Sequence, residues 1–411
     1  MTRRPRTDGG DTPERAGDDE SGSATTDAHS GAEPERAVTR PAPLNAMLAA
    51  SGLGGRARAY AASLTDWERN VAGALLAYVA LLTVLVGVGV LRWAYLLYLL
   101  SLAGMYVLLA MGLNVQWGYS GLINFSVAAF FGVGAYATLL LSSPSSPLLG
   151  AEMAIWRWPI VGVVVSILAG VALAVLIGYP TLSLRDDYLA IATLGLAEVV
   201  RLFALNQRDW TGGSQGIIGL DRLFGNWPLV GDLVGELSEP ELNFLLAVTF
   251  VAVTWLLLRR VHRSPWGRVQ RLLRADEDLA EALGKNTFRF RMESFVIGGA
   301  IMALAGVFFA HFNNSVFPSN LDPIRTFDVW IAAILGGTGS DNGAVVGGIV
   351  VVTIIEGTRF TGGVIPVEPG ALRLLLTGLL IVALMRFRPE GVLPPQRELV
   401  WPAAAGGSDD E

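Results

Sequence analysis

The sequence contains no cysteine, which excludes disulfide bonds, thiolate catalysis and cysteine-ligated zinc or iron–sulfur centres. Its histidines, His29, His262 and His311, are far apart in the sequence and form no metal-binding motif. Charge is scarce as well. Asp, Glu, Lys and Arg make up 16% of the 411 residues, against about 25% in a typical soluble domain. Lys285 is the only lysine, so nearly all positive charge is carried by arginine.

The few charges are also unevenly placed. From Trp93 to Ala151 the chain has no Asp, Glu, Lys or Arg, and hydrophobic residues make up 52% of the whole sequence. A soluble fold does not need so long an uncharged stretch, whereas each helix that crosses a bilayer needs about 20 consecutive apolar residues. The apolar runs lack the alternation of a membrane β-barrel. We therefore predict an all-α polytopic membrane protein.

Ten apolar segments are candidates for membrane-spanning helices. They lie near residues 71–91, 94–115, 121–141, 159–179, 188–206, 242–260, 293–312, 326–340, 343–360 and 371–387. The fifth, eighth and ninth are the weakest candidates, because they are short, interrupted by Gly or carry a charge. About ten crossings are favoured over eight with re-entrant pieces, and five in each half would form an inverted repeat.

The placement of arginine predicts the orientation in the membrane. Six arginines crowd the stretch 259–274, with no acidic residue among them, which places the loop 261–292 in the cytoplasm. Arg386 and Arg388 place the C-terminus on the same side. Counting outward across ten segments leaves both termini in the cytoplasm and the loop 208–241 outside.

The ends of the chain differ from its middle. Residues 1–68 are mostly polar, and Gly, Pro, Ser, Thr, Asp and Glu dominate the first 45 of them, which predicts a disordered cytoplasmic tail. Residues 69–390 form the predicted membrane domain, and residues 391–411 a C-terminal cytoplasmic tail.

The segment 159–179 carries a small residue at every fourth position: Gly162, Ser166, Gly170, Ala174 and Gly178. Small side chains allow two helix backbones to approach closely. We therefore interpret this stripe as a packing face, and a pore-lining helix is the alternative.

Polar residues within the apolar segments are candidates for a translocation path, namely Asn114, Asn124, Thr193 and Glu198. An interhelical hydrogen bond is the simpler explanation for each asparagine. Glu198 lies three residues before Arg201, on the same helical face. A charge at membrane depth costs about 2.5–3.5 kcal/mol, so a structural ion pair is favoured over contact with a zwitterionic substrate.

The sequence lacks an energy source for active transport. A phosphate-binding loop requires Gly-x4-Gly-Lys-Ser/Thr, but the only lysine follows Gly284 and precedes Asn286. The chain of intramembrane carboxylates that proton pumps use is also absent. Either a partner subunit hydrolyses ATP or the protein is a passive pore.

The loop 261–292 favours a partner subunit. Ser264 and Pro265 predict the start of a helix, and Gly284 predicts its end. This helix would offer leucines for docking: Leu272, Leu273, Leu279 and Leu283. A membrane-surface helix anchored by arginine is the alternative.

A series of short blocks runs from about Ala94 to Leu393. These blocks are Gly112-Leu-Asn-Val, Gly118-Tyr-Ser-Gly121, Ala128–Tyr136, Asp187–Gly195, Thr211–Ile217, Glu277–Gly284, Gly336-Gly-Thr-Gly-Ser340 and Phe387–Leu393. In their order and spacing they resemble the LivM-type permease of branched-chain amino acid ABC transporters. One departure is Ser126-Val127, where that family commonly has Gly-His.

The resemblance implies an importer of two permeases and two ATPases in the cell membrane, fed by an extracellular binding protein. ATP and magnesium would bind the separate ATPase chains, and no cofactor, metal or nucleic acid would bind this one. The implied ATPase contact comprises Glu277, Leu279, Ala280, Glu281, Ala282 and Gly284. A contact with the binding protein, or a gate, is implied at Thr211, Gly212, Gly213 and Ser214.

Other functions remain open at this point. The same machinery in related permeases imports urea, short amides or other amino acids. A stand-alone channel or a secondary carrier is a further alternative. A membrane enzyme is the least supported, because the sequence shows no metal set and no nucleophile–base pair.

Overall fold

The computed structural model describes residues 66–147, 159–220, 236–359 and 368–395. All of them belong to the second of two compact units, Leu64–Glu411. The first unit, Met1–Ser63, lies outside the described residues, and so does almost all of the predicted N-terminal tail.

All ten predicted segments contain a helix, and eight helices in the described ranges are long and apolar enough to cross a membrane. The eight are α3 (Asp66–Gly87), α4 (Trp93–Leu113, continued by the π-helix η1, Asn114–Tyr119), α7 (Pro159–Thr181), α8 (Asp186–Asn206), α11 (Glu239–His262), α14 (Thr287–Asn313), α16 (Asp341–Arg359) and α17 (Pro369–Phe387).

The remaining two helices are shorter than predicted: α5 (Val127–Ser142) has 16 residues and α15 (Pro323–Gly336) has 14. At about 1.5 Å per residue, neither reaches the roughly 30 Å of a hydrocarbon core. The segment predicted near 121–141 is thus helical only from Val127 on, and the one near 326–340 is replaced by a helix over Pro323–Gly336. Residues 121–126 are not helical, and Gly337 leaves the helical region with a φ of 113°.

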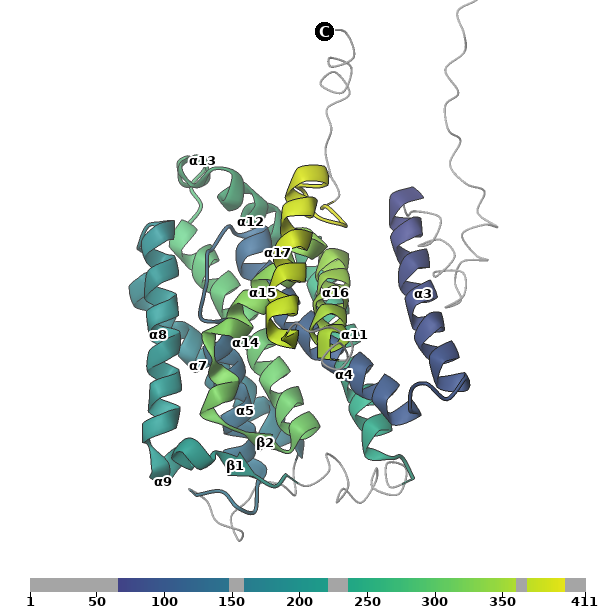
Figure 1. Cartoon of the computed structure of the whole chain (residues 1–411). Coiled ribbons are helices and arrows are strands. Elements are labelled where there is room, and N and C mark those ends of the chain that lie inside the picture. The colour runs from purple at the N-terminus through teal and green to yellow at the C-terminus, as the bar shows by residue number, and fades with distance from the viewer. Residues whose placement is uncertain (1–65, 148–158, 221–235, 360–367, 396–411) are drawn as a thin grey trace, which may run out of the picture. The chain divides into compact units, whose positions relative to one another are not determined.

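The shorter elements lie at the two ends of the helices (Figure 1). One end carries α12 (Pro265–Ala275) and α13 (Glu277–Ala282). The opposite end carries α9 (Arg208–Thr211) and the strands β1 (Ile217–Ile218) and β2 (Ser315–Val316), which pair antiparallel. The 3₁₀ helices η3 and η4 complete the elements, at Gly213–Gln215 and Pro318–Leu321.

The core is formed by α4, α5 and α14. Helix α14 packs against α4, α5 and α7, and α4 also packs against α11 and α16. Helix α4 is apolar on all sides, which suits an element surrounded by other helices. In contrast, α17 has no buried residue, so its apolar surface is left for lipid or for another protein.

The small-residue stripe of α7 is a packing face, as predicted. A Cβ atom added at Gly170 would overlap Ala303 of α14, and one at Gly178 would lie 3.1 Å from the side chains of Met292 and Phe295. The glycines therefore allow the close contact between α7 and α14.

Candidate functional site

The loop 261–292 folds as two helices rather than the single helix predicted. Asp276 has an extended backbone and separates α12 from α13, and its carboxylate accepts a hydrogen bond of 2.9 Å from the amide of Leu279. Asp276 is thus the N-cap of α13. Ser264 precedes α12 as expected, but its hydroxyl donates to the carbonyl of Val261 (2.6 Å) instead of capping the helix. We call residues 265–284 the coupling hairpin.

The predicted ATPase-contact residues divide into exposed and buried groups. Leu279 is 48% exposed and Leu283 61% exposed, and both lie at the tip of the coupling hairpin. Ala280 is fully buried, so its side chain holds the hairpin together and is not available to another protein. Leu273 is buried too, which removes it from the leucines predicted for docking. Ala282 and Gly284 are exposed.

The two glutamates of α13 are held by the start of α14. Arg291 donates to both carboxylate oxygens of Glu277 (3.1 and 3.0 Å), and the hydroxyl of Thr287 donates to Glu281 (2.9 Å). Gly284 has a φ of +74°, a conformation that glycine adopts readily at a helix end. These contacts fix the coupling hairpin against a membrane helix.

The coupling hairpin also contacts two glycine-containing turns, residues 118–121 and 336–340, and a third turn, residues 391–393, packs against the second of them; we call the three turns the glycine junction. Gly118 lies against Gly339, and Gly391 lies against Gly337. Arg274 of α12 donates to the carbonyl of Gly118 and, at 3.1 Å, to the hydroxyl of Thr338. The first two turns are therefore in direct contact, although they are more than 200 positions apart in the sequence.

Arg274 keeps its charge at this position. Desolvation lowers the pKa of its guanidinium, but an arginine starts far above neutral pH and stays protonated. A second contact lies close to that of Arg274: the hydroxyl of Ser120 donates a hydrogen bond to the side chain of Gln270 (2.7 Å). Two side chains of α12 thus reach the turn that follows η1.

Residues 121–126 are not helical and form a break between η1 and α5. Asn114 and Asn124 lie in a buried polar network around this break. The side-chain oxygen of Asn114 accepts from the amide of Gly339 (2.7 Å). The side chain of Asn124 donates to Gln116 (2.7 Å), and its oxygen accepts from the amide of Ser126 (2.7 Å). These bonds satisfy backbone groups that the missing helical turns leave unpaired.

Thr193 joins this network, but Glu198 does not. The amide of Phe125 donates to the hydroxyl of Thr193 (3.0 Å), which links the break to α8. Glu198 instead accepts from Arg201 (2.8 Å), as the ion-pair interpretation predicted. The two side chains are 37% and 26% exposed, so the pair lies on an open face of α8.

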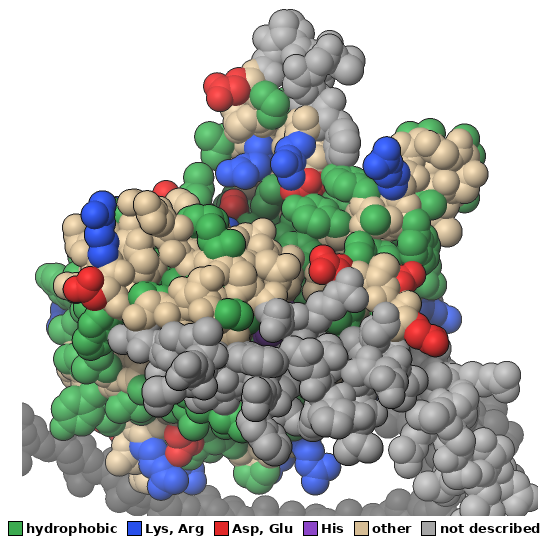
Figure 2. Space-filling model, turned by 90° about the horizontal axis from the view of Figure 1, so that it is seen from below, with side chains coloured by type: hydrophobic (Ala, Val, Ile, Leu, Met, Phe, Trp, Pro, Cys, Tyr) green, Lys and Arg blue, Asp and Glu red, His purple; other side chains and the backbone are tan. Residues whose placement is uncertain are grey.

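At the opposite end of the molecule, the predicted outer-loop residues form a compact turn. Gly212 and Gly213 have φ angles of +73° and +58°, which glycine adopts without strain. Thr211 is buried and its hydroxyl reaches the carbonyl of Ala204 (2.7 Å), whereas Ser214 is exposed. Figure 2 shows this end: hydrophobic side chains share the coloured surface with other side chains and backbone, and charged side chains form small separate groups.

Comparisons with known proteins identify the family. The family described as "Branched-chain amino acid transport system / permease component" matches residues 95–385, well over half of the chain. This chain belongs to that family. As a permease component it is a multi-pass membrane transport subunit, and ATP hydrolysis in such ABC systems is carried out by separate subunits.

Named relatives agree with this assignment. The permease is 32% identical to the high-affinity branched-chain amino acid transport system permease protein LivM of Escherichia coli, over 74% of this chain and 72% of the relative. It is 28% identical to a probable LivM of Methanocaldococcus jannaschii, over 73% of this chain and 93% of that protein. LivH of Escherichia coli is 28% identical over 61% and 80% of the respective chains. No solved structure matches the permease.

Sequence reasoning missed the residues that connect the permease's coupling hairpin to its membrane helices. Arg274 is one of several loop arginines that indicate the cytoplasmic side of the membrane, and its spacing does not distinguish it from the others. Gln270 and Ser120 are ordinary polar residues until the fold brings them together. His262 is a further example: its Nδ1 atom lies 3.0 Å from a carboxylate oxygen of Asp341, where α11 ends and α16 begins.

Proposed function

We propose that this permease is half of the membrane path of an ATP-driven importer of branched-chain amino acids. The other components are a second permease of the LivH kind, two ATPases that bind ATP and magnesium, and an extracellular binding protein. The observation that carries the proposal is the coupling hairpin, whose side chains reach the glycine junction between membrane helices. Such a connection converts movement of a docked ATPase into movement of the path.

The proposed ATPase contact is the exposed tip of the coupling hairpin. Leu279 and Leu283 supply apolar surface, and Glu277, Glu281, Ala282 and Gly284 surround them. Ala280 supports this surface from inside. Apolar anchors within a polar rim are typical of a protein–protein contact.

We further propose ten crossings in the form of an inverted repeat. Helices α5 and α15 each follow an irregular segment, 120–126 and 314–322 respectively, and each is the third helix of its half. Their neighbours correspond as well: α5 packs against α7 and α14, and α15 packs against α16 and α4. Ten crossings leave both termini on the cytoplasmic side of the membrane, as is the coupling hairpin, with the turn at Thr211–Ser214 outside, facing the binding protein.

The proposed path runs beside the helix break that carries Asn114 and Asn124. Irregular backbone within a membrane protein is tolerated where it lines a cavity or is buried in protein. Thr193 connects this break to α8, and Glu198 lies on the same helix, on the open face that a second permease would cover. A charged pair is unfavourable toward lipid, which supports a protein or water contact at that face.

Reconstitution of the complex tests this function. The permease is purified with its partner permease and both ATPases, placed in proteoliposomes, and given the matched binding protein with labelled leucine or labelled urea. We expect leucine to accumulate only with ATP on the ATPase side. Uptake of urea but not leucine would assign a different cargo to the same machinery. Transport by the purified chain without nucleotide would instead establish a channel or carrier and refute the proposal.

A further inference from the structure

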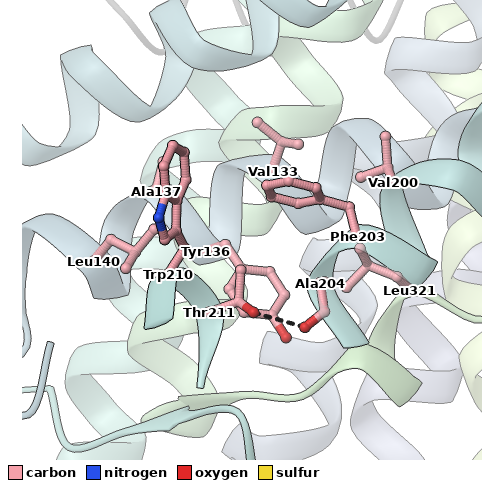
Figure 3. A pocket seen from close by; sticks show the side chains of 10 residues that line it. All are labelled: Val133, Tyr136, Ala137, Leu140, Val200, Phe203, Ala204, Trp210, Thr211 and Leu321. Atoms are coloured by element: carbon pink, nitrogen blue, oxygen red, sulfur yellow. Dashed lines mark hydrogen bonds between the residues drawn. The ribbon is translucent and has the colours of Figure 1, made fainter. Parts of the chain in front are cut away.

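Helix α8 packs against the rest of the permease with one of its sides. The residues on that side recur at helical spacing and are buried: Leu189, Thr193, Ala197 and Ala204. Figure 3 shows Val200 and Ala204 on this side, next to α5 and around a small cavity with apolar walls. The remaining sides of α8 are open, and their exposed residues include Ile191 and Leu202.

The open part of α8 carries an ion pair in the middle of the helix. The Nε atom of Arg201 donates to Glu198 at 2.8 Å, and both side chains are partly exposed. Helix α8 is long and apolar enough to cross a membrane. Glu198 lies about 12 Å or more from either end of it, at 1.5 Å per residue. In a membrane-spanning α8 the pair therefore lies within the hydrocarbon layer.

The ion pair leaves hydrogen-bond donors unused. Arg201 directs its Nε and Nη2 atoms to Glu198, and its Nη1 atom has no hydrogen-bond partner among the residues that the structure describes. Asp322, the N-cap of α15, interacts with Arg201 electrostatically, and α15 contacts α8. A charged group at membrane depth is unfavourable unless its hydrogen-bonding atoms face protein or water. The donors on Nη1 therefore point to a partner on this side of α8.

The exposed sides of α7 and α11 differ from that of α8. Helix α7 contains no charged residue, and the charged residues of α11 all lie close to its two ends. Their exposed sides present large apolar residues, such as Leu168 and Leu176 on α7 and Leu256 on α11. Lipid covers such surfaces without burying a charge, so lipid is the expected neighbour of α7 and α11. The ion pair sets α8 apart from them as a side directed to protein or water.

The start of α15 extends this side of α8. Ile324 and Phe327 of α15 are exposed. The ring of Phe125, from the helix break, lies 5.7 Å from the ring of Phe327, and the amide of Phe125 donates to Thr193 of α8. We call the open side of α8, Phe125 and the start of α15 the α8–α15 surface. Large apolar side chains around an arginine are typical of a protein–protein contact, which favours protein over water as the neighbour.

We propose that the α8–α15 surface is the contact with the second permease, and that a polar or acidic group of that chain accepts from Nη1 of Arg201. The proposal rests on the proposed function, which supplies the second permease, and it adds the surface on this chain that meets it. Because LivH of Escherichia coli is itself similar in sequence to this chain, two such permeases can pack about a pseudo-two-fold axis through the same surface of each. The helix break at 121–126 then lies beside the contact, and the proposed path runs between the two permeases.

Site-directed photo-crosslinking in the assembled complex tests the proposal. Benzoylphenylalanine replaces one exposed residue at a time, either Ile191 or Phe327 on the α8–α15 surface, or Leu176 on α7 or Leu256 on α11 as matched controls. The crosslinked products are identified by mass spectrometry. We expect covalent adducts with the second permease from the first two positions. At the two controls these adducts should be lost, with lipid adducts in their place.

Arg201→Met tests the ion pair itself. It leaves Glu198 unpaired in the contact, so about tenfold less of the second permease should co-purify with each permease recovered. Arg201→Lys keeps the positive charge and should restore most of the co-purification. Arg260→Met, at the exposed end of α11, is the matched control and should leave co-purification unchanged.

Lipid adducts alone at Ile191 and Phe327 would overturn the proposal, and so would adducts with a second copy of this chain. Adducts of the second permease with Leu176 or Leu256 would place the contact on α7 or α11 instead. Equal co-purification in Arg201→Met and wild type would refute the role given to Arg201. In each of these cases leucine uptake by the wild-type complex keeps the proposed function intact, whereas a complex that transports leucine without any second permease refutes both.

Discussion

The side-chain oxygen of Gln270 accepts a hydrogen bond of 2.7 Å from the hydroxyl of Ser120, although the two residues are 150 positions apart in the sequence. Gln270 lies on the first helix of the coupling hairpin, and Ser120 directly follows the π-helical end of α4. Ser120 also lies 2.5 Å from the hydroxyl of Ser294 on α14. One hydroxyl therefore connects the hairpin with two membrane helices, and a displacement of the hairpin reaches both.

Arg274 provides the first prediction. Close to the Gln270–Ser120 bond, its guanidinium donates hydrogen bonds to two turns of the glycine junction. Hydrogen bonds to a charged group contribute about 1.5–3 kcal/mol each, so Arg274→Ala should loosen the junction. We expect about tenfold less leucine uptake for each ATP hydrolysed, since about 1.4 kcal/mol corresponds to a factor of ten. The measurement is uptake and ATP hydrolysis on the same proteoliposomes.

Two further variants separate coupling from assembly. Arg274→Lys keeps the charge but loses the planar fork that reaches both turns, so it should restore uptake only in part. Arg268→Ala changes an exposed arginine of the same helix and should behave as wild type. An unchanged ratio of uptake to hydrolysis in Arg274→Ala would show that the contact plays no part in coupling.

Much of this arrangement could be predicted from the sequence, for identifiable reasons. Long apolar runs indicate membrane helices independently of detailed packing, so each of the ten segments proved to contain a helix. The stripe from Gly162 to Gly178 predicted close packing because small residues every fourth position fall on one helix face.

The rest depends on contacts between distant parts of the chain. The helix break at 121–126 follows a long apolar run without a charged residue, so hydropathy alone does not reveal it. Side chains such as Asn114 and Asn124 accept hydrogen bonds from backbone amides near the breaks, which a hydropathy profile also does not show. Burial of Ala280 could not be predicted either, because the short α13 shows no clear apolar period until it is packed against α14.

The coupling hairpin provides the second prediction. The double variant Glu281→Arg/Gly284→Arg should abolish co-purification of the ATPases with the permease, because two large positive side chains enter the proposed contact. At Gly284 the change also costs about 1–2 kcal/mol, since its φ of +74° disfavours a residue with a Cβ atom. Ser214→Arg at the opposite end should leave co-purification normal. Assembly of the double variant with its ATPases would argue against this docking site.

The third prediction concerns the contact between α5 and α14. A Cβ atom at Gly306 would overlap the carbonyl oxygen of Phe131. Gly306→Ala should therefore destabilise the permease by about 1–3 kcal/mol, the usual range for overpacking. Gly195→Ala is the matched control, because nothing lies within 4 Å of its added methyl group and alanine favours a helix. In thermal unfolding of the purified variants, Gly306→Ala should have a lower midpoint temperature than Gly195→Ala. Equal midpoints would contradict the packing argument.

Thr193 provides the fourth prediction. Its hydroxyl accepts from the amide of Phe125 and is itself bonded to the carbonyl of Leu189 (2.8 Å). Thr193→Val keeps the shape but leaves a part-buried amide without its acceptor, which costs up to about 1–3 kcal/mol. We expect lower thermal stability and slower leucine uptake. Thr193→Ser retains the hydroxyl and should preserve both, so equal loss in the two variants would exclude the hydrogen bond as the cause.

The absence of cysteine makes the orientation directly testable, because any introduced thiol is the only one in the chain. Ser214→Cys and Lys285→Cys place that thiol on exposed residues at opposite ends of the described helices. With the coupling hairpin in the cytoplasm, a membrane-impermeant maleimide should label Ser214→Cys on intact cells and Lys285→Cys only after permeabilisation. The reverse pattern would place the hairpin outside, where no ATPase reaches it, and would remove the basis for an ATP-driven importer. Labelling of both thiols on intact cells would mean that the two ends lie on the same side, and ten crossings would then be wrong.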